Sequence, residues 1–191
     1  MEDFLRTPVV PDYRGLPRYR DLNQLRTLVW EKSVFGASNP DQSSVTAPTG
    51  GYSATAPFIT LRNVGNKVLI PLIARALINS GSTLNQINVS TLATGQFTSG
   101  TALAVYNRNQ RGVGSSVVAY TNATLPAFTA GNQILRYTMT AIVTSNARTR
   151  LEMFPYPGFV VVQPGGQLDI YSNSASGSAT SWFFDIQWAE L

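Results

Sequence analysis

Residues 181–190, SWFFDIQWAE, decide the fold class of this chain. Large apolar side chains recur there at every second position, which is the period of a β-strand with one buried face. Four of them share that face: Trp182, Phe184, Ile186 and Trp188. A flat platform for a cofactor is the alternative, but aromatic residues at this period far more often form a core. The stretch therefore predicts one wall of a β-sandwich.

The same period continues upstream, interrupted by turns that contain Gly, Asn or Pro. We expect strands in APFITLRNV, KVLIPLIARALINS, INVSTLAT, TALAVYNRN, SSVVAYTNAT, QILRYTMTAIVTS and RTRLEMF, and on both sides of the Pro-Gly-Gly turn at 164–166. Pro71 indicates an edge or a bulge. A helix over residues 72–79 competes, but Pro71 and the β-branched flanks favour a strand. Residues 51–191 are thus predicted to form an all-β domain, a jelly-roll-like antiparallel β-sandwich of eight or nine strands.

The first 50 residues differ in character, and we expect an extended N-terminal arm followed by a linker. Pro8, Pro11 and Pro17 favour extended backbone, with room for a short helix that begins at Asp21. A disordered tail is the alternative, but the arm carries many apolar and aromatic side chains. Such an arm is suited to lie along a partner. The expected contacts are burial of aromatic and leucine side chains and pairing of arginines with acidic groups. The candidate partner-binding residues are Tyr13, Arg14, Leu16, Arg18, Tyr19, Arg20 and Trp30.

The composition of the chain argues against most catalytic and metal-binding functions. The chain has no Cys and no His, which excludes disulfides, thiolate metal sites, Cys nucleophiles and a Ser-His-Asp triad. We expect no enzyme activity, no cofactor and no metal. A pair of catalytic carboxylates, Asp169 and Asp185, facing each other across the C-terminal strands is the alternative, but polar positions facing solvent are the preferred interpretation. No apolar stretch of about 18 residues predicts a membrane span, and no secretory signal is expected.

Charge is sparse and unevenly placed. Charged residues make up 13% of the chain, against about 25% in a typical domain, and this favours permanent assembly. Residues 42–151 contain no acid, whereas residues 152–191 contain acids and no base. We expect strands of these two segments to pair, so that opposite charges meet within one sheet. The basic residues are scattered, which does not favour nucleic-acid binding.

Three motifs together resemble a known class of proteins. LRNVGNKVLIPLIARAL, VVVQPGGQLDIYS and SWFFDIQWAEL are similar, in this order, to small jelly-roll structural proteins of tailed bacteriophages. The likeness covers residues 58–191 and leaves the arm out. It implies a virion protein with no catalytic residues: a capsid decoration (cement) protein, or a head or tail accessory protein. The implied partners are the major capsid protein or other virion proteins. We also expect a homo-oligomer, with a trimer as the first choice.

A second function remains open, that of a neck, tail or fibre accessory protein that binds a glycan or receptor. Such a site needs exposed aromatic residues beside amide side chains. The candidates are Tyr106, Asn107, Tyr120 and Asn122.

Overall fold

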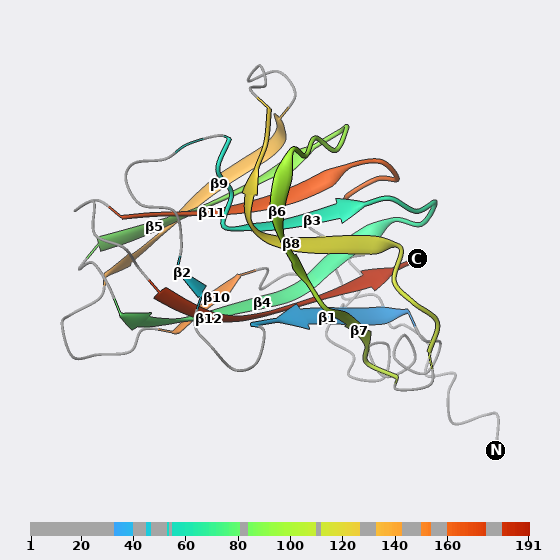
Figure 1. Ribbon diagram of the computed structural model, residues 1–191, viewed down its shortest axis with the longest axis horizontal. Helices are drawn as coiled ribbons and strands as arrows, with labels where there is room; N and C mark the ends of the chain where they lie inside the picture. Colours follow the sequence, from blue (N-terminus) through green and yellow to red (C-terminus); the bar gives the residue numbers. More distant parts are fainter. Residues whose placement is uncertain are drawn as a thin grey trace, which may run out of the picture.

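The computed structural model describes residues 33–39, 45–46, 53, 55–80, 84–109, 112–126, 133–142, 150–153, 160–174 and 181–191. These residues form twelve strands in two antiparallel six-stranded sheets, stacked as two layers in Figure 1. The prediction of an all-β sandwich is confirmed. Within the described ranges, no helix is long and apolar enough to cross a membrane.

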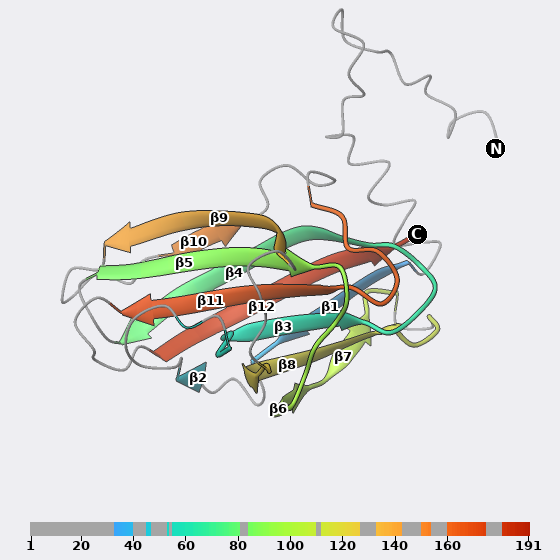
Figure 2. The same ribbon diagram turned by 90° about the horizontal axis from the view of Figure 1, so that it is seen from above.

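Sheet A contains the strand that decided the fold class. Along the sheet its strands are β10 (Arg150–Met153), β4 (Leu69–Ser80), β12 (Ser181–Glu190), β1 (Val34–Ser38) and β7 (Val105–Asn107), while β2 (Val45–Thr46) pairs with β12. The second layer is sheet B, seen from above in Figure 2. Its order is β6 (Ser99–Leu103), β8 (Val117–Thr124), β3 (Ile59–Asn63), β11 (Gln167–Ser174), β5 (Leu84–Leu92) and β9 (Gln133–Ile142).

The chain passes repeatedly from one layer to the other. It alternates between the sheets from β3 to β4 to β5, and again from β9 through β10 and β11 to β12. This alternation fits the jelly-roll-like arrangement expected from the sequence. Twelve strands exceed the eight or nine expected, in part because TALAVYNRN is divided between β6 and β7 and because two strands precede Gly50.

The core lies between the layers, and β12 supplies its wall as predicted. Trp182, Ile186 and Trp188 are fully buried and Phe184 is 5% exposed, whereas the alternate residues from Ser181 to Gln187 are partly exposed. From sheet B, Phe58 packs edge-on against Phe184, with 5.6 Å between ring centroids. Aromatic packing of this kind contributes beyond the apolar area that it buries.

Residues 72–79 lie within β4, so the preference for a strand over a helix is confirmed. The register between β4 and β12 shifts beside Pro71, because Gln187 pairs with Ile73 while the next residue, Trp188, pairs with Pro71. One extra residue, Leu72, therefore occupies the β4 side of a bulge. A bulge accommodates a proline, which has no N–H to give to the ladder.

The structure differs from the sequence expectation between residues 34 and 46. Val34–Ser38 and Val45–Thr46, assigned to the arm and linker, are strands of sheet A. β1 lies between β12 and β7, where Phe35 is 2% exposed and stacks on Trp188 with 6.4 Å between centroids. Burial of Phe35 and Ala37 stabilises this segment as part of the sandwich.

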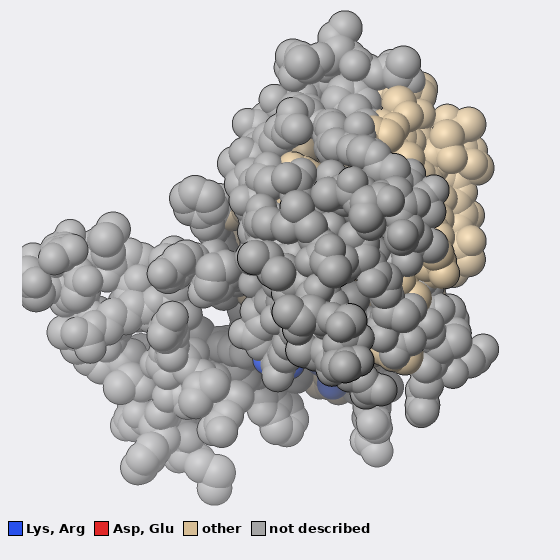
Figure 3. All heavy atoms as spheres, turned by 90° about the vertical axis from the view of Figure 1, so that its left-hand side faces the viewer, with Lys and Arg blue, Asp and Glu red and all other residues tan. Residues whose placement is uncertain are grey.

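Charges of the acidic C-terminal segment meet bases of the acid-free middle in sheet A, as expected. Asp185 on β12 lies opposite Arg75 on β4 and forms an ion pair with Arg108 at 3.4 Å. Figure 3 views the left-hand end of Figure 1, where the described surface is mostly uncharged and Lys or Arg atoms appear at the lower edge.

Candidate functional site

The seven candidate partner-binding residues, from Tyr13 to Trp30, lie outside the described residues. The structure does describe where their segment joins the sandwich. The N–H of Glu190 donates to the carbonyl of Ser33 at 2.9 Å, and the N–H of Arg108 donates to the carbonyl of Val34 at 2.8 Å. The arm is therefore attached to β12 and to the end of β7 before it enters sheet A as β1.

The three motifs that carry the sequence resemblance meet at this same end of the sandwich. In the first motif, Asn63 is 1% exposed, and its amide nitrogen donates to the carbonyls of Lys67, Val162 and Gln163 at 2.7–3.3 Å. Its amide oxygen accepts the N–H of Gly65. One buried side chain thus closes the turn between β3 and β4 and binds it to the segment before the Pro-Gly-Gly turn. The sequence predicts a strand there, but among the described residues of this segment Val162 forms only an isolated bridge with Leu69.

In the second motif, Gly165 has a φ of +79°, which a residue with a side chain rarely adopts. Its N–H donates to the carbonyl of Asn63 at 3.0 Å, and its carbonyl accepts the N–H of Gly95. Gly166 leaves little room for a side chain, because a Cβ there would lie 3.0 Å from the carbonyl oxygens of Gln163 and Leu92. The backbone therefore favours glycine at both positions of the turn, through the positive φ of Gly165 and the close carbonyl oxygens beside Gly166.

In the third motif, Glu190 is 2% exposed and its carboxylate accepts hydrogen bonds from four donors. These are the hydroxyls of Ser115 and Ser116, the N–H of Ser116 at 3.0 Å and the indole N–H of Trp188 at 3.1 Å. Burial raises the pKa of Glu190, but these hydrogen bonds outweigh it and hold the pKa below 4.5. An ionised Glu190 thus binds the loop before β8 to the end of β12.

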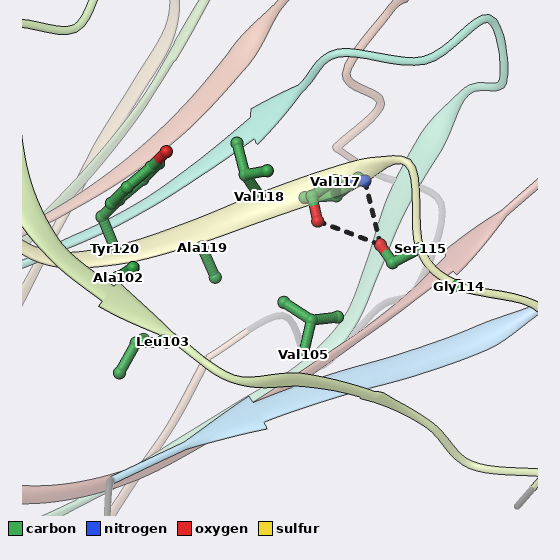
Figure 4. Close-up of a pocket in the computed structure, with 9 residues that line it drawn as sticks. All are labelled: Ala102, Leu103, Val105, Gly114, Ser115, Val117, Val118, Ala119 and Tyr120. Atoms are coloured by element: carbon green, nitrogen blue, oxygen red, sulfur yellow. Dashed lines mark hydrogen bonds between the residues drawn. The ribbon is translucent and has the colours of Figure 1, made fainter.

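Beside this loop an open groove lies at the edge of the sandwich (Figure 4). It forms where the chain leaves sheet B: β6 pairs with β8 up to Leu103, and from Val105 onward β7 pairs with β1 in sheet A. The first residues of β8 are therefore left beside a gap of about 370 Å³. We call this gap the edge groove; its lining residues are Ala102, Leu103, Val105, Gly114, Ser115, Val117, Val118, Ala119 and Tyr120.

The lining of the edge groove carries no charged residue and is more apolar than polar. Leu103, Val117 and Ala119 belong to the hydrophobic core and reach the groove from within. At the strand edge in its wall, Val117 N–H donates to Ser115 Oγ at 2.9 Å, and the Ser115 hydroxyl, which donates to Glu190, lies 3.1 Å from the Val117 carbonyl. Most of the lining side chains are apolar, so the groove suits an apolar group.

Sequence reasoning missed the edge groove and the residues that shape it, Ser115, Ser116 and Glu190. The groove depends on one continuous run, TALAVYNRN, changing sheets at Ala104, and no local pattern marks that change. The only sequence signal is the run Gly112-Val-Gly-Ser-Ser116, in which small residues leave space beside the strand.

The four residues proposed for a glycan site do not converge. Tyr106 and Asn107 lie on β7 of sheet A, whereas Tyr120 and Asn122 lie on β8 of sheet B. Tyr120 stacks on Phe97, with 4.1 Å between centroids, and Asn107 binds the loop that follows its own strand. Tyr106 is 38% exposed and lies under the Arg108 guanidinium.

Asp169 and Asp185 do not form a carboxylate pair, because β11 and β12 belong to different sheets. The preferred interpretation, a polar position facing solvent, is wrong for Asp169, which is fully buried. It accepts hydrogen bonds from Thr60 Oγ1 at 2.8 Å and from Gln167 Nε2 at 2.8 and 2.9 Å. Burial raises the pKa of Asp169 to about 7, although both hydrogen bonds lower it. Gln167 also accepts the N–H of Gln96, so the segment between β5 and β6 crosses this face of sheet B.

Among the described residues, no group of three or more acidic side chains is placed to hold a metal ion.

Comparisons with known proteins assign no family to this chain. No family model matches the chain, and no curated protein matches it. Among solved structures, one similarity is to the infectious bursal disease virus VP2 subviral particle, with 11% identity and a TM-score of 0.18. The match covers 83% of this chain and 41% of that chain, so the chain spans less than half of that chain's length. A similarity this low carries no argument about function, which is argued below from the chain's own residues.

Proposed function

We propose that this protein is a non-enzymatic virion structural protein, a capsid decoration protein that docks on the major capsid lattice through its N-terminal arm and stabilises it. The observation that carries the proposal is the position of β1. The arm continues directly into a strand that is hydrogen-bonded on both sides, to β12 and to β7. A partner bound by residues 1–32 is thereby linked to the centre of sheet A and not to a loose loop.

Two further observations support the proposal. The arm carries three aromatic residues among its candidate contacts, Tyr13, Tyr19 and Trp30, and aromatic residues dominate the binding energy of protein interfaces. The three motifs that resemble phage structural proteins also have definite roles at the end of the sandwich where the arm attaches. Asn63 and Gly165 shape turns, and Glu190 fixes a loop.

The test is co-sedimentation with purified phage heads stripped of accessory proteins. Three proteins are compared: the full-length chain, a chain lacking residues 1–32, and one full-length variant in which Tyr13, Leu16 and Tyr19 are all changed to Ser. The deletion stops at residue 32 because removal of β1 would also remove Phe35 and Ala37 from the core. Circular dichroism and thermal unfolding of each variant show whether the sandwich is intact.

We expect only the full-length chain to sediment with heads. Equal sedimentation of all three folded variants would assign the interface to the sandwich and contradict the role of the arm. If none sediments, the decoration function fails, and the same variants would next be tested on necks, tails and a glycan array.

A further inference from the structure

We propose that residues 93–98 form a strap over sheet B whose opening depends on pH: the strap is closed while the carboxyl of Asp169 is neutral and opens when that carboxyl ionises. The strap is the connection between β5 and β6. The inference goes beyond the proposed function and does not depend on it, because it concerns residues of the sandwich alone.

The strap crosses the side of sheet B that faces away from the core. Three strands, β11, β3 and β8, separate β5 from β6 in that sheet, so the connection passes over all three. Figure 2 shows this path from the end of β5 to β6. Along it the N–H of Gly95 donates to the carbonyl of Gly165 at 2.6 Å, and the Phe97 ring stacks on Tyr120 of β8. The strap is therefore a thin layer that these contacts hold against the sheet.

One buried side chain, Gln167, connects the strap to Asp169. The amide oxygen of Gln167 accepts the N–H of Gln96 at 3.0 Å, and its amide nitrogen donates to both carboxyl oxygens of Asp169, at 2.8 and 2.9 Å. Thr60 donates to the same carboxyl group at 2.8 Å. A change in the charge or hydration of Asp169 therefore reaches the strap through a single amide group.

The surroundings of Asp169 favour its neutral form. Asp169 is fully buried, and none of the described side chains forms an ion pair with it. Ser90 lies opposite Asp169 on β5, is 1% exposed, and its hydroxyl has no hydrogen-bond partner. A neutral carboxyl carries an O–H that needs an acceptor, and the Ser90 hydroxyl suits that role. In agreement with this arrangement, burial raises the pKa of Asp169 to about 7.

The other ionisable residues on the strands around Asp169 are few. On the outer side of the sheet they are Arg62 on β3, Tyr171 on β11 and Tyr120 on β8. The Arg62 side chain lies against the strap, since a Cβ at Gly95 would be 3.1 Å from its Nε. β9 places Arg136 in register with Ser90, and the side chain of Arg136 lies outside the described ones. The strap itself has no charged residue.

An ionised Asp169 is a buried charge without a described counter-ion, and a charge of this kind requires water. From the core side, water reaches β11 only if the two sheets part. From the outer side, it needs only the loss of the hydrogen bonds from Gly95 and Gln96 and of the Phe97 stack. The strap is therefore the described element that opens at the lowest cost, as a local event within a folded sandwich.

The direction of the pH dependence follows from the two states of the strap. Under the closed strap the pKa of Asp169 is about 7, and under an open strap it returns toward the ordinary value of 3.8. Between these two values the open state becomes about tenfold more populated with each pH unit, and above about pH 7 its population is constant.

Amide hydrogen exchange of the full-length chain, followed residue by residue by NMR from pH 5 to pH 8, measures this opening. Dividing each rate by the intrinsic rate of a free amide at the same pH gives the open fraction. The strap is monitored at Gly95 and Gln96, and opening of the whole sandwich at Val89 in β5. Asp169→Asn keeps an uncharged group at the centre of the network. Asp185→Asn, which removes an acid from sheet A, is the matched control.

In wild type and in Asp185→Asn, we expect the open fraction of the strap amides to rise about 100-fold from pH 5 to pH 7 and to level off above pH 7. In Asp169→Asn the open fraction should stay at its low value throughout. At every pH the strap amides should be open more often than the amide of Val89, by about tenfold or more.

Three outcomes would overturn the inference. An open fraction of the wild-type strap that is level from pH 5 to pH 7 would show that Asp169 does not control it. An equal rise in Asp169→Asn would assign the pH dependence to another group. Strap and Val89 amides that open equally often would mean that the strap opens only when the whole sandwich unfolds. If Asp169→Asn does not fold, the wild-type profile and its comparison with Val89 decide.

Discussion

The carboxylate of Glu190 accepts both the N–H and the hydroxyl of Ser116, at 3.0 and 2.7 Å. This contact joins the end of β12 to the loop that leads into β8, across 74 residues of sequence. Together with the bonds from Ser115 and Trp188 it holds one wall of the edge groove. The pKa of Glu190 is lowered, so the ionised form is the one that the fold favours.

We expect Glu190→Gln to lower the free energy of unfolding at pH 7 by about 1–3 kcal/mol, because an amide NH₂ would face groups that are themselves donors. Since the folded-state pKa is depressed below 4.5, the contribution of Glu190 is present above that pH and is lost as pH falls through the folded pKa. Urea unfolding of both chains at pH 7 and pH 3 should therefore show the difference shrinking in acid. Asp185→Asn is the control, because its ion pair is about one-third exposed and contributes about 1 kcal/mol at most. Equal stability of Glu190→Gln and wild type at pH 7 would contradict this account.

Asp169 should give the opposite pH dependence. Its folded pKa of about 7 lies above its ordinary value of 3.8, so the neutral form is favoured by folding. The stability it confers is fully present below pH about 4, falls by roughly 1.4 kcal/mol per pH unit up to about 7, and is constant above that. Asp169→Asn, which stays neutral, should match or exceed wild type at pH 8 and lose that advantage at pH 5. Chemical denaturation at these two pH values is the measurement. A wild type whose stability is flat between pH 4 and 7 would show that Asp169 remains ionised.

Alanine substitutions at three glycines should distinguish the cost of an unfavourable backbone φ from the cost of a steric clash with neighbouring atoms. Gly165→Ala should cost about 1 kcal/mol, because its φ of +79° disfavours a side chain although the space around it is open. Gly166→Ala should cost more, about 2 kcal/mol or above, because its Cβ would press on two carbonyl oxygens. Gly114→Ala meets no atom within 4 Å and should change stability by less than about 0.5 kcal/mol. Thermal unfolding of the three variants tests this order, and a Gly114→Ala variant as unstable as Gly166→Ala would contradict it.

Phe35→Ala should destabilise the sandwich by about 3–5 kcal/mol, the range for removing a buried phenylalanine. Phe35 is 2% exposed and stacks on Trp188, so its loss leaves a cavity against the core wall. Ser38→Ala, on the outer face of the same strand, should change stability by less than about 0.5 kcal/mol. Denaturant unfolding monitored by tryptophan fluorescence distinguishes the two. A small effect of Phe35→Ala would mean that β1 contributes little to the folded state.

The strand β12 could be predicted from sequence because its pattern is complete in ten residues. The strand β1 could not, since VFGAS is only five residues long and its register is set by β12, about 150 residues away. Pro71 was informative for a local reason, because a missing N–H requires a bulge or an edge wherever the strand lies.

The burial of Asp169 was missed for a different reason. Leu168 and Ile170 face the core, so Asp169 between them points to the other side of β11, which the sequence analysis took to face solvent. Alternation shows which side of a sheet a residue faces, but not whether a crossing segment covers that side. Here the segment around Gln96 and Phe97 crosses that side. The edge groove was missed likewise, because it results from two strands parting and not from a residue pattern.

The pairing of β1 with β12 has a consequence for the order of events during synthesis. Sheet A cannot close until Glu190 has left the ribosome, because β12 lies between β4 and β1. Pairings this distant in sequence form late and slowly. Chains that stop before β12 therefore leave β1, and the arm joined to it, without a rigid base. If the arm docks as proposed, the topology of the sheet would keep incomplete chains out of the assembly.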